Sequence, residues 1–217
     1  RQSYPKIVLM VGNVCNKEGF DYLSQKDFDV DCVRVGIGNG SICTTRLETG
    51  IGKGQFSAVM ECFGNIDGPK IICDGGSLGK TGNKFKALAA GASVIMLGRT
   101  LSCTYESPGQ VIIRNGKQFK YIRGMASSMA NISKQEKQQA DTLKTNFTAE
   151  GVDGEHLMSG DVESVIEQIN GGLRSGLSYL GVDGIEQLHE KRLADKIKFN
   201  IVTSIGMSET GVRVKTY

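Results

Sequence analysis

Four short apolar runs mark the first half of the chain, and a turn containing glycine follows each of them. The runs cover residues 6–11, 32–35, 70–73 and 94–97. Continuous apolar runs of this length are typical of strands in a buried parallel sheet. Segments with helical patterning lie between them, at 17–25, 57–64 and 83–90. This alternation predicts an α/β fold with a parallel sheet, in which functional residues follow the carboxyl ends of the strands.

The pattern changes beyond residue 105. Two apolar-containing runs, 110–113 and 117–121, flank Asn115-Gly116, a dipeptide that favours the tight turn of a β-hairpin. The stretch 131–150 is polar and nearly free of aromatic residues, which is typical of a solvated helix or a mobile flap. Asp161 is suited to cap a helix over 161–170, and Gly171-Gly172 is expected to end it. Further on, the patterns predict helices over 174–180 and 184–192 and a last strand over 199–202.

Composition narrows the class of protein. The 217 residues suffice for one domain with a substantial core, and a net charge of +3 is too small to indicate a nucleic-acid or acidic-membrane partner. No apolar run is long enough to span a bilayer, and no signal peptide opens the chain. The six cysteines follow no metal-ligand spacing, so we expect reduced thiols in a cytoplasmic protein. His156 and His189 lie in polar stretches and are expected at the surface, without a functional role.

The candidate chemistry is concentrated in residues 35–46, which read VGIGNGSICTTR. Three glycines let this backbone approach a ligand closely. Ser41, Thr45 and Arg46 offer hydroxyl and guanidinium groups that suit an anionic, oxygen-rich ligand. Donors and a positive charge near Cys43 favour its thiolate, which is the nucleophilic form. The alternative is a glycine-rich loop with a buried, inert cysteine.

The same string resembles the active-site cysteine loop of the IMP dehydrogenase and GMP reductase family. Further matches to landmarks of that family follow in the family's order: GNV at 12–14, DGG at 74–76, MLG at 96–98, ESPG at 106–109, RGM at 123–125, EGV at 150–152 and GGLRS at 171–175. The resemblance implies an α/β fold that is the C-terminal half of a (β/α)8 TIM barrel, strands five to eight, with a β-hairpin, a mobile flap and C-terminal helices.

On this interpretation residues 1–217 form a single partial catalytic domain. Residues 1–105 supply four βα units, 106–155 the hairpin and active-site flap, and 156–217 the C-terminal helices and last strand. Four βα units cannot close an eight-stranded barrel, and a half barrel leaves two sheet edges and an apolar interior exposed. The first half is therefore expected either upstream in a longer protein or in another chain.

The resemblance also assigns the catalytic roles. Cys43 would attack C2 of a purine nucleoside monophosphate, GMP or IMP, and form a covalent adduct, which divides one difficult step into easier ones. Thr45 and Glu150 would act together in proton transfer, because a hydroxyl alone is a poor base and a carboxylate partner helps it. Without the resemblance, Glu150 would be interpreted as a solvated carboxylate on a flap.

The remaining substrate contacts are implied in the same way. Turns after the last two strands of such barrels bind phosphate through backbone N–H groups, and Asp74 would bind the ribose hydroxyls, with a helix N-cap as its alternative. Arg99 stands where relatives carry a small serine; it would add charge to the phosphate or crowd it, or else be a surface arginine. Tyr121 lies one residue before the place of a phosphate-binding tyrosine, which here is Ile122. The expected phosphate and base contacts are Ser41, Gly75, Gly76, Gly98, Arg99, Tyr121, Met125, Ala126 and Ser127.

The family implies a nicotinamide dinucleotide, NADPH or NAD, against the cysteine loop, with Asn13 and Arg46 as candidate contacts. The chain itself has no GxGxxG after a strand, so this prediction depends on the resemblance. A monovalent cation, K+, is also implied. Its ligands would be carbonyl oxygens of Gly38, Gly40 and Cys43, together with Glu209, Thr210 and Gly211 of a neighbouring subunit. Relatives are tetramers, so a homotetramer is expected at full length.

The choice of reaction lies between two members of the family. A dehydrogenase must hydrolyse its adduct, and the family's dehydrogenases use an Arg-Tyr pair in the flap; residues 125–149 contain neither, and the aligned positions read Lys137-Gln138-Gln139. That difference, with FSAVMEC at 56–62 and SSMA at 127–130, favours NADPH-dependent reductive deamination of GMP to IMP. The flap length, EGVDG at 150–154 and GGLRSG at 171–176 favour NAD-dependent oxidation of IMP to XMP. A phosphate-binding barrel with another substrate and an inactive fragment or subunit are the remaining alternatives.

Overall fold

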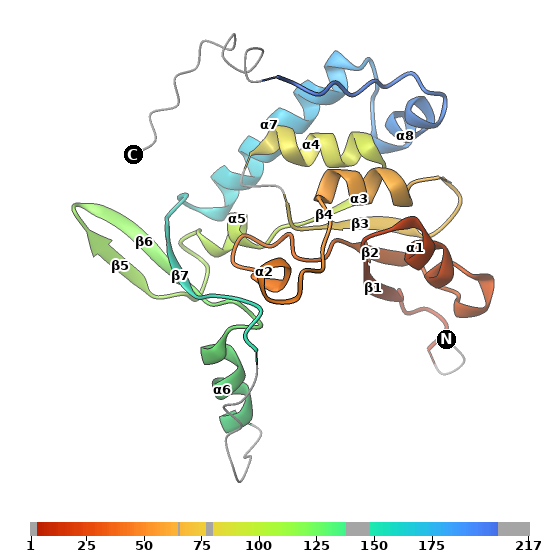
Figure 1. Cartoon of the computed structure of the whole chain (residues 1–217). Helices are drawn as coiled ribbons and strands as arrows, with labels where there is room; N and C mark the ends of the chain where they lie inside the picture. The colour runs from red at the N-terminus through yellow and green to blue at the C-terminus, as the bar shows by residue number, and fades with distance from the viewer. Residues whose placement is uncertain (1–3, 65, 77–79, 138–147, 204–217) are drawn as a thin grey trace.

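The computed structural model of the chain describes residues 4–64, 66–76, 80–137 and 148–203 and contains two sheets and several helices (Figure 1). A four-stranded parallel sheet has the order β1-β2-β3-β4, formed by Met10–Val14, Cys32–Val35, Lys70–Asp74 and Val94–Met96. An antiparallel sheet has the order β5-β6-β7, formed by Val111–Arg114, Lys117–Ile122 and Gly154–Leu157. The helices are α1 (Lys17–Leu23), the 3₁₀ helix η1 (Lys26–Phe28), α2 (Thr45–Thr49), α3 (Gln55–Cys62), α4 (Thr81–Ala90), α5 (Arg99–Ser102), α6 (Ser128–Lys137), α7 (Val162–Tyr179) and α8 (Ile185–Leu193). The expected α/β class with a parallel sheet is confirmed.

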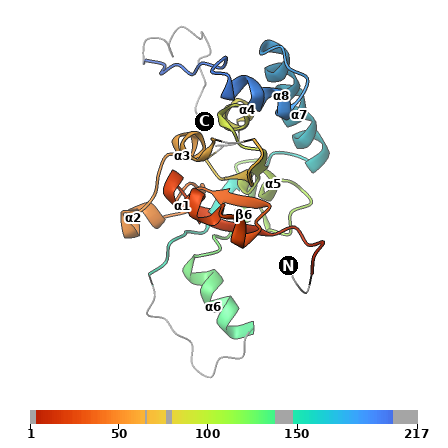
Figure 2. The same ribbon diagram turned by 90° about the vertical axis from the view of Figure 1, so that its right-hand side faces the viewer.

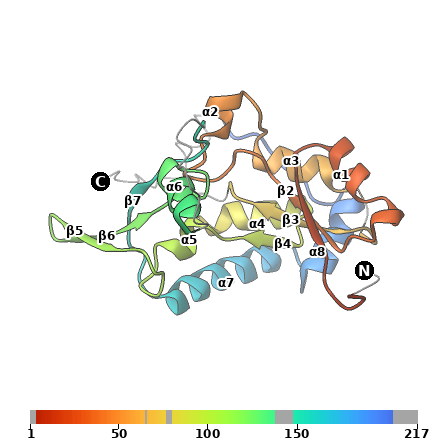
Figure 3. The ribbon, with the colours of Figure 1, turned by 90° about the horizontal axis from the view of Figure 1, so that it is seen from below.

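Helices cover one face of the parallel sheet. Val33, Val35 and Ile71 on this face are at most 2% exposed and belong to a core that includes residues of α1, α3 and α4. Helices α7 and α8 contact α4 and form an outer layer beyond it (Figures 1 and 3). The core therefore lies between the sheet and its helices, and the carboxyl ends of the strands stay free to carry loops.

The opposite face of the parallel sheet is open in the part of the chain that the structure describes. Met10, Val94 and Met96 are 58%, 47% and 37% exposed. The apolar runs of the sequence predict strands buried on both faces, but residues of this chain bury one face much more completely than the other.

The predicted hairpin is present. Asn115 and Gly116 have φ of +49° and +71°, and β5 and β6 pair antiparallel on either side of them. Strand β7, which the sequence analysis did not expect, pairs with the other edge of β6. Lys120 of β6 is 2% exposed, and its ammonium donates to the carbonyls of Ser107 (2.5 Å) and Gly109 (2.8 Å), which fastens the preceding loop to this sheet.

Helix α6 extends away from both sheets (Figure 2). Its residues 131–137 lie in the first part of the polar stretch 131–150, so this part is helical. The rest of the proposed flap, 138–147, lies outside the described residues.

Two predicted strands are wrong. The first strand was expected at 6–11 but spans Met10–Val14, because Met10 is the residue that pairs with Cys32. The Leu9 N–H instead donates to the Asp31 carboxylate (2.7 Å). Residues 199–202 form no strand; Phe199 is held by its side chain, which meets Phe56 edge-on with 4.9 Å between ring centroids.

The expected helix break at Gly171-Gly172 is also wrong, because α7 continues to Tyr179. Asp161 caps this helix as predicted, accepting from the Ser164 N–H (2.7 Å). Packing explains one of the glycines: a Cβ at Gly172 would lie 2.4 Å from Cγ2 of Thr81 in α4, whereas a Cβ at Gly171 would meet nothing within 4 Å. Close approach of α7 to α4 therefore requires a glycine at 172 and not at 171.

This difference gives a matched pair of variants. Gly172→Ala is expected to lower the free energy of unfolding by about 1–3 kcal/mol through overpacking. Gly171→Ala is expected to raise it by up to about 1 kcal/mol, because alanine is the better helix former. Urea unfolding followed by circular dichroism measures both, and equal effects of the two substitutions would contradict the packing argument.

His189 is buried, so its prediction as a surface residue is wrong. It is 5% exposed in α8, with Nε2 at 3.2 Å and 3.1 Å from the carbonyl oxygens of Leu88 and Ala92. Burial lowers the pKa of His189 below its ordinary 6.5, although the two carbonyls oppose this shift. His156 lies in β7 and is half-buried, with its Nε2 buried and unpartnered.

The lowered pKa predicts acid sensitivity. Below pH about 6.5 the unfolded chain binds a proton at His189 more readily than the folded chain, so the free energy of unfolding falls as pH drops. His189→Gln removes this titration. Urea unfolding at pH 7.5 and pH 5.5 should show a larger loss for wild type than for the variant; the same loss in both would contradict the prediction.

Candidate active site

A backbone ladder joins the cysteine loop to a segment distant in the sequence. The Thr44 N–H donates to the Glu150 carbonyl (2.8 Å), and the Val152 N–H donates to the Ile42 carbonyl (2.9 Å). Cys43 and Gly151 pair between them as an antiparallel bridge. The loop that follows β2 and the end of the predicted flap are thereby fixed side by side.

Three of the predicted residues meet at this ladder. The Cys43 thiol donates to Oγ1 of Thr45 (3.1 Å), and the Thr45 hydroxyl donates to Oε2 of Glu150 (2.8 Å). All three side chains are partly buried. The hydrogen bonds point the same way, from sulfur to carboxylate, so a proton leaving the thiol has a continuous path to a base. We refer to Cys43, Thr45 and Glu150 as the relay.

Four thiols outside the relay, those of Cys32, Cys62, Cys73 and Cys103, have raised pKa values. Burial raises the pKa of the Cys62 thiol to about 12, and it also raises the pKa of Cys73 and Cys103. Burial, with the nearby Asp31, raises the pKa of Cys32. A raised pKa lowers the thiolate fraction at neutral pH. These cysteines behave as core residues, as expected from the sequence.

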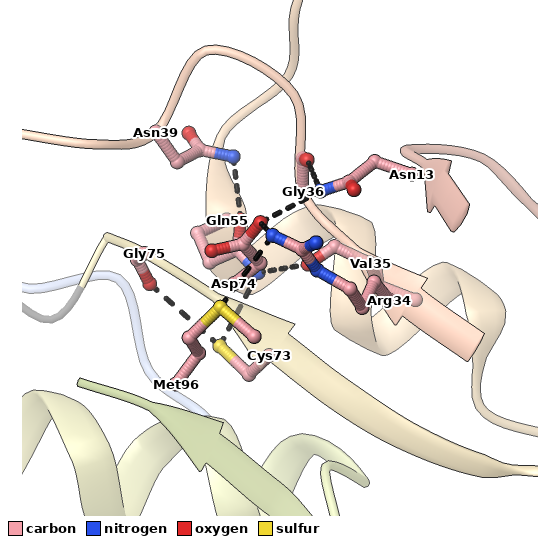
Figure 4. Close-up of polar contacts among 10 residues, drawn as sticks. All are labelled: Asn13, Arg34, Val35, Gly36, Asn39, Gln55, Cys73, Asp74, Gly75 and Met96. Atoms are coloured by element: carbon pink, nitrogen blue, oxygen red, sulfur yellow. Dashed lines mark hydrogen bonds and ion pairs between the residues drawn. The ribbon is translucent and has the colours of Figure 1, made fainter. Parts of the chain in front are cut away.

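Asp74, at the end of β3, is held by side chains of β1 and β2 (Figure 4). Its Oδ2 accepts from Nδ2 of Asn13 (2.7 Å) and from Nη2 of Arg34 (2.8 Å). Asp74 is not the N-cap of α4, because Lys80 occupies that position. Sequence analysis missed Arg34; a charged residue inside an otherwise apolar strand was the available signal.

Gln55 was also missed, and its side chain connects the end of β2 to the loop that follows it (Figure 4). It is 8% exposed at the start of α3. Its Nε2 donates to the carbonyl of Val35 (2.6 Å), and its Oε1 accepts from Nδ2 of Asn39 (2.5 Å). This amide therefore connects the end of β2 to the cysteine loop and fixes the shape of the loop.

The predicted phosphate contacts are only partly assembled. Gly75 and Gly76 have φ of +82° and +74°, but the Gly76 N–H donates to the Asn39 carbonyl (3.0 Å) and is not available to a ligand. Gly98 precedes α5 at the end of β4, the neighbour of β3, and Ser41 is exposed. Arg99 lies near the Cys103 thiol and His156, and Tyr121 is 37% exposed on β6.

The predicted base contacts differ among themselves. Met125 is 94% exposed and Ala126 is exposed as well. Ser127 is 2% exposed, and its hydroxyl accepts from the Ala130 N–H (3.2 Å) in the first turn of α6. Its side chain thus caps the helix, and its contact with a base stays a prediction.

The predicted cofactor contacts fit a dinucleotide unequally. Asn13 commits both hydrogens of its amide to Asp74 and to the Gly36 carbonyl (2.7 Å), which leaves its carbonyl oxygen to accept from a ligand. Arg46 donates to the Lys53 carbonyl, and its aliphatic part lies against Gly38 and Gly52, where an added Cβ would come within 2.6 Å of its Cγ. Asn13 therefore fits a carboxamide donor, whereas Arg46 braces the loop.

The predicted cation ligands are tested only in part by the geometry. The Gly40 carbonyl accepts from the Cys43 N–H (3.1 Å), and Gly38 has φ of +75°. Glu209, Thr210 and Gly211 lie outside the described residues. Within the described ranges, no group of three or more His, Cys, Asp or Glu side chains could hold a metal ion. Nor does any helix in those ranges have the length and apolar character needed to cross a membrane.

Comparison with known proteins identifies the family. The model of the IMP dehydrogenase / GMP reductase domain matches residues 1–213. Inosine-5'-monophosphate dehydrogenase of Nitrosopumilus maritimus is 43% identical over 88% of this chain and 40% of its own length. GMP reductase of Leishmania donovani is 38% identical over 95% of this chain and 41% of its own length. A crystal structure of GMP reductase from Trypanosoma brucei in complex with guanosine 5'-monophosphate has a TM-score of 0.83 and 37% identity, covering 95% of this chain and 41% of that chain.

The chain thus spans about two fifths of the length of these relatives. The match nevertheless runs along almost the whole of this chain, including the loop and the relay. The chain belongs to the IMP dehydrogenase / GMP reductase family.

Proposed function

We propose that the protein carrying this chain is a purine nucleotide oxidoreductase in which the Cys43 sulfur bonds covalently to C2 of a purine nucleoside monophosphate. The observation that carries this proposal is the directed relay from Cys43 through Thr45 to Glu150. The bound GMP of the Trypanosoma brucei relative supports the class of substrate. Both activities named among the relatives act on such a nucleotide.

The favoured reaction is reductive deamination of GMP to IMP. Attack of the thiol on C2 forms the C–S bond, and the C2–N bond to the amino group breaks as ammonia leaves. The thiol loses a proton in this step and the leaving amino group needs one. The relay accepts the proton of the thiol and donates a proton to the leaving amino group, so the step balances without a base from solvent. The bound nicotinamide dinucleotide would supply the hydride that reaches C2 and releases the cysteine.

The flap sequence favours this reductase activity over the dehydrogenase. Residues 125–149 contain no arginine and no tyrosine, the pair that resemblance assigns to water activation in a dehydrogenase. A glutamine at 138 or 139 cannot take a proton from water. NADPH is therefore the favoured cofactor, and the free carbonyl oxygen of Asn13 would accept a hydrogen bond from its carboxamide.

Oxidation of IMP to XMP with NAD is the second candidate. The EGVDG and GGLRSG strings favour it, and relatives named IMP dehydrogenase match at 43% identity. In that reaction water would hydrolyse the same adduct, so the proposed role of Cys43 is shared by both candidates.

Substrate binding is proposed at the carboxyl ends of β3 and β4. The N–H of Gly75, Gly98 and the exposed Ser41 would hold the phosphate, and Asp74, oriented by Arg34 and Asn13, would accept from the ribose hydroxyls. Tyr121, Met125 and Ala126 remain candidate contacts. The carbonyls of Gly38, Gly40 and Cys43 remain candidate K+ ligands.

We propose further that the parallel sheet is the second half of an eight-stranded barrel within a single partial catalytic domain of residues 1–217. Its open face and its two edge strands, β1 and β4, are the surfaces that a first half would cover. A homotetramer at full length follows from the same proposal.

The two reactions are separated by a direct assay of the full-length protein. GMP with NADPH should give IMP and ammonia, whereas IMP with NAD should give little XMP. Rapid formation of XMP would overturn the reductase proposal. If neither IMP nor XMP is formed, the oxidoreductase proposal is overturned.

A further inference from the structure

A cavity with several cationic side chains on its wall lies on the helix-covered side of the parallel sheet. A cavity of about 770 Å³ is bordered there by the ends of β2 and β3, by α3 and α4, and by residues after α8. The cavity has no wall in common with the relay. Its walls include Gln55 and Phe56 of α3, Lys84 and Lys86 of α4, and Lys198 and Phe199.

Lys84 is the feature that this fold leaves unexplained. It is 1% exposed in α4, and its ammonium nitrogen is buried without a hydrogen-bond partner. Burying a charged group without a partner is strongly unfavourable. Desolvation accordingly lowers the pKa of Lys84 below its ordinary value. A negative charge beside this nitrogen would remove the penalty.

The charged side chains that border the cavity are all positive. Arg46, Lys84, Lys86 and Lys198 border it, and none of the described residues on its wall is an aspartate or a glutamate. Arg46 and Lys198 already have partners, the Lys53 carbonyl and the Asp195 carboxylate. The cationic wall around Lys84 therefore favours an anion over a neutral or cationic ligand.

The same cavity has an apolar side. Phe56, Ile95, Phe199 and Ile201 lie on its wall. Its volume is in the range of pockets that hold small organic molecules rather than a lone inorganic ion. Size and lining together indicate a ligand with an anionic group and an apolar body.

We propose that this cavity binds a small organic anion, either a phosphate monoester or a carboxylate, whose negative group pairs with the ammonium of Lys84 and whose apolar part packs against Phe56 and Phe199. Gly38, Arg46 and Gly75 border this cavity and are also candidate cation, cofactor and phosphate contacts. Lys84, Phe56 and Phe199 belong to none of those contacts, and the proposal does not depend on the proposed reaction.

Calorimetric titration with phenyl phosphate and with benzoate tests the proposal and distinguishes the two anionic groups. At least one probe should bind wild type, and Lys84→Met should weaken its binding about tenfold or more, as expected for loss of a charged hydrogen bond. Lys80→Met is the matched control, since Lys80 is exposed at the N-cap of the same helix and does not border the cavity. It should leave binding unchanged.

Amide chemical shifts locate the bound probe. Changes at residues 83–87 and 199–201 support the proposal. The proposal would be overturned if Lys84→Met bound the probe as tightly as wild type. It would also be overturned if the chemical-shift changes were confined to Gly98, Arg99 and Tyr121, a result that would leave the proposed nucleotide phosphate site intact. Lys84→Met removes an unpaired buried charge, so it should fold at least as stably as wild type.

Discussion

Replacing Cys43 with alanine is expected to abolish turnover while nucleotide binding survives. Without the sulfur no adduct forms, so kcat should fall to below about one thousandth of the wild-type value. The proposed phosphate and ribose contacts, which are Ser41 and the groups at the ends of β3 and β4, do not include the Cys43 sulfur, so the dissociation constant for GMP should change by less than about threefold. Steady-state assay and calorimetric titration of the full-length protein measure the two quantities.

Cys32→Ala is the matched control for this experiment. Cys32 is the first residue of β2, at the end of the strand away from the loop, and burial raises the pKa of its thiol. Its removal should leave kcat close to wild type. Turnover retained in Cys43→Ala, or lost equally in both variants, would remove Cys43 from the mechanism.

Replacing Glu150 with glutamine is expected to lower kcat by about 10²–10⁴-fold with little change in KM. Glutamine has nearly the same shape, but its amide cannot take the proton that Thr45 donates to Oε2 across 2.8 Å. Thr45→Val breaks the same path at its middle. Because the two residues act as a unit, the double variant should be little slower than either single variant.

Glu155→Gln is the control for the carboxylate. Glu155 lies on β7 and pairs with Arg114 (2.9 Å) away from the relay. It should keep wild-type kcat. Additive losses in the double variant at 45 and 150 would show that the two side chains act separately, contrary to the relay.

The sequence predicted the relay residues better than the residues that hold the surrounding loops and Asp74 in place. Cys43 and Thr45 are two residues apart, so a local string contains both of them. Glu150 could be added only through resemblance, because the backbone ladder that brings it to the loop joins distant segments. Arg34 was missed because its partner Asp74 depends on which strands are neighbours. Gln55 was missed because its partners depend on where α3 packs against the end of β2, and a single sequence gives neither arrangement.

The wrong predictions of secondary structure have tertiary causes. Helical propensity alone ends a helix at Gly171-Gly172, but close packing of Gly172 on Thr81 allows α7 to continue. Residues 199–202 have the composition of a strand but no neighbouring strand, and an aromatic contact holds Phe199 instead. His189 lies in a polar stretch, and two backbone carbonyls of another segment make its burial tolerable.

The central claim is that the Cys43 sulfur forms a bond to the purine ring. Mass spectrometry of the full-length protein, quenched with acid after mixing with GMP in the absence of reductant, tests it most directly. The peptide containing Cys43 should gain the mass of GMP less that of ammonia, and Cys43→Ala should show no gain. An unmodified Cys43 peptide in protein that turns GMP over, or an adduct on another cysteine, would contradict it.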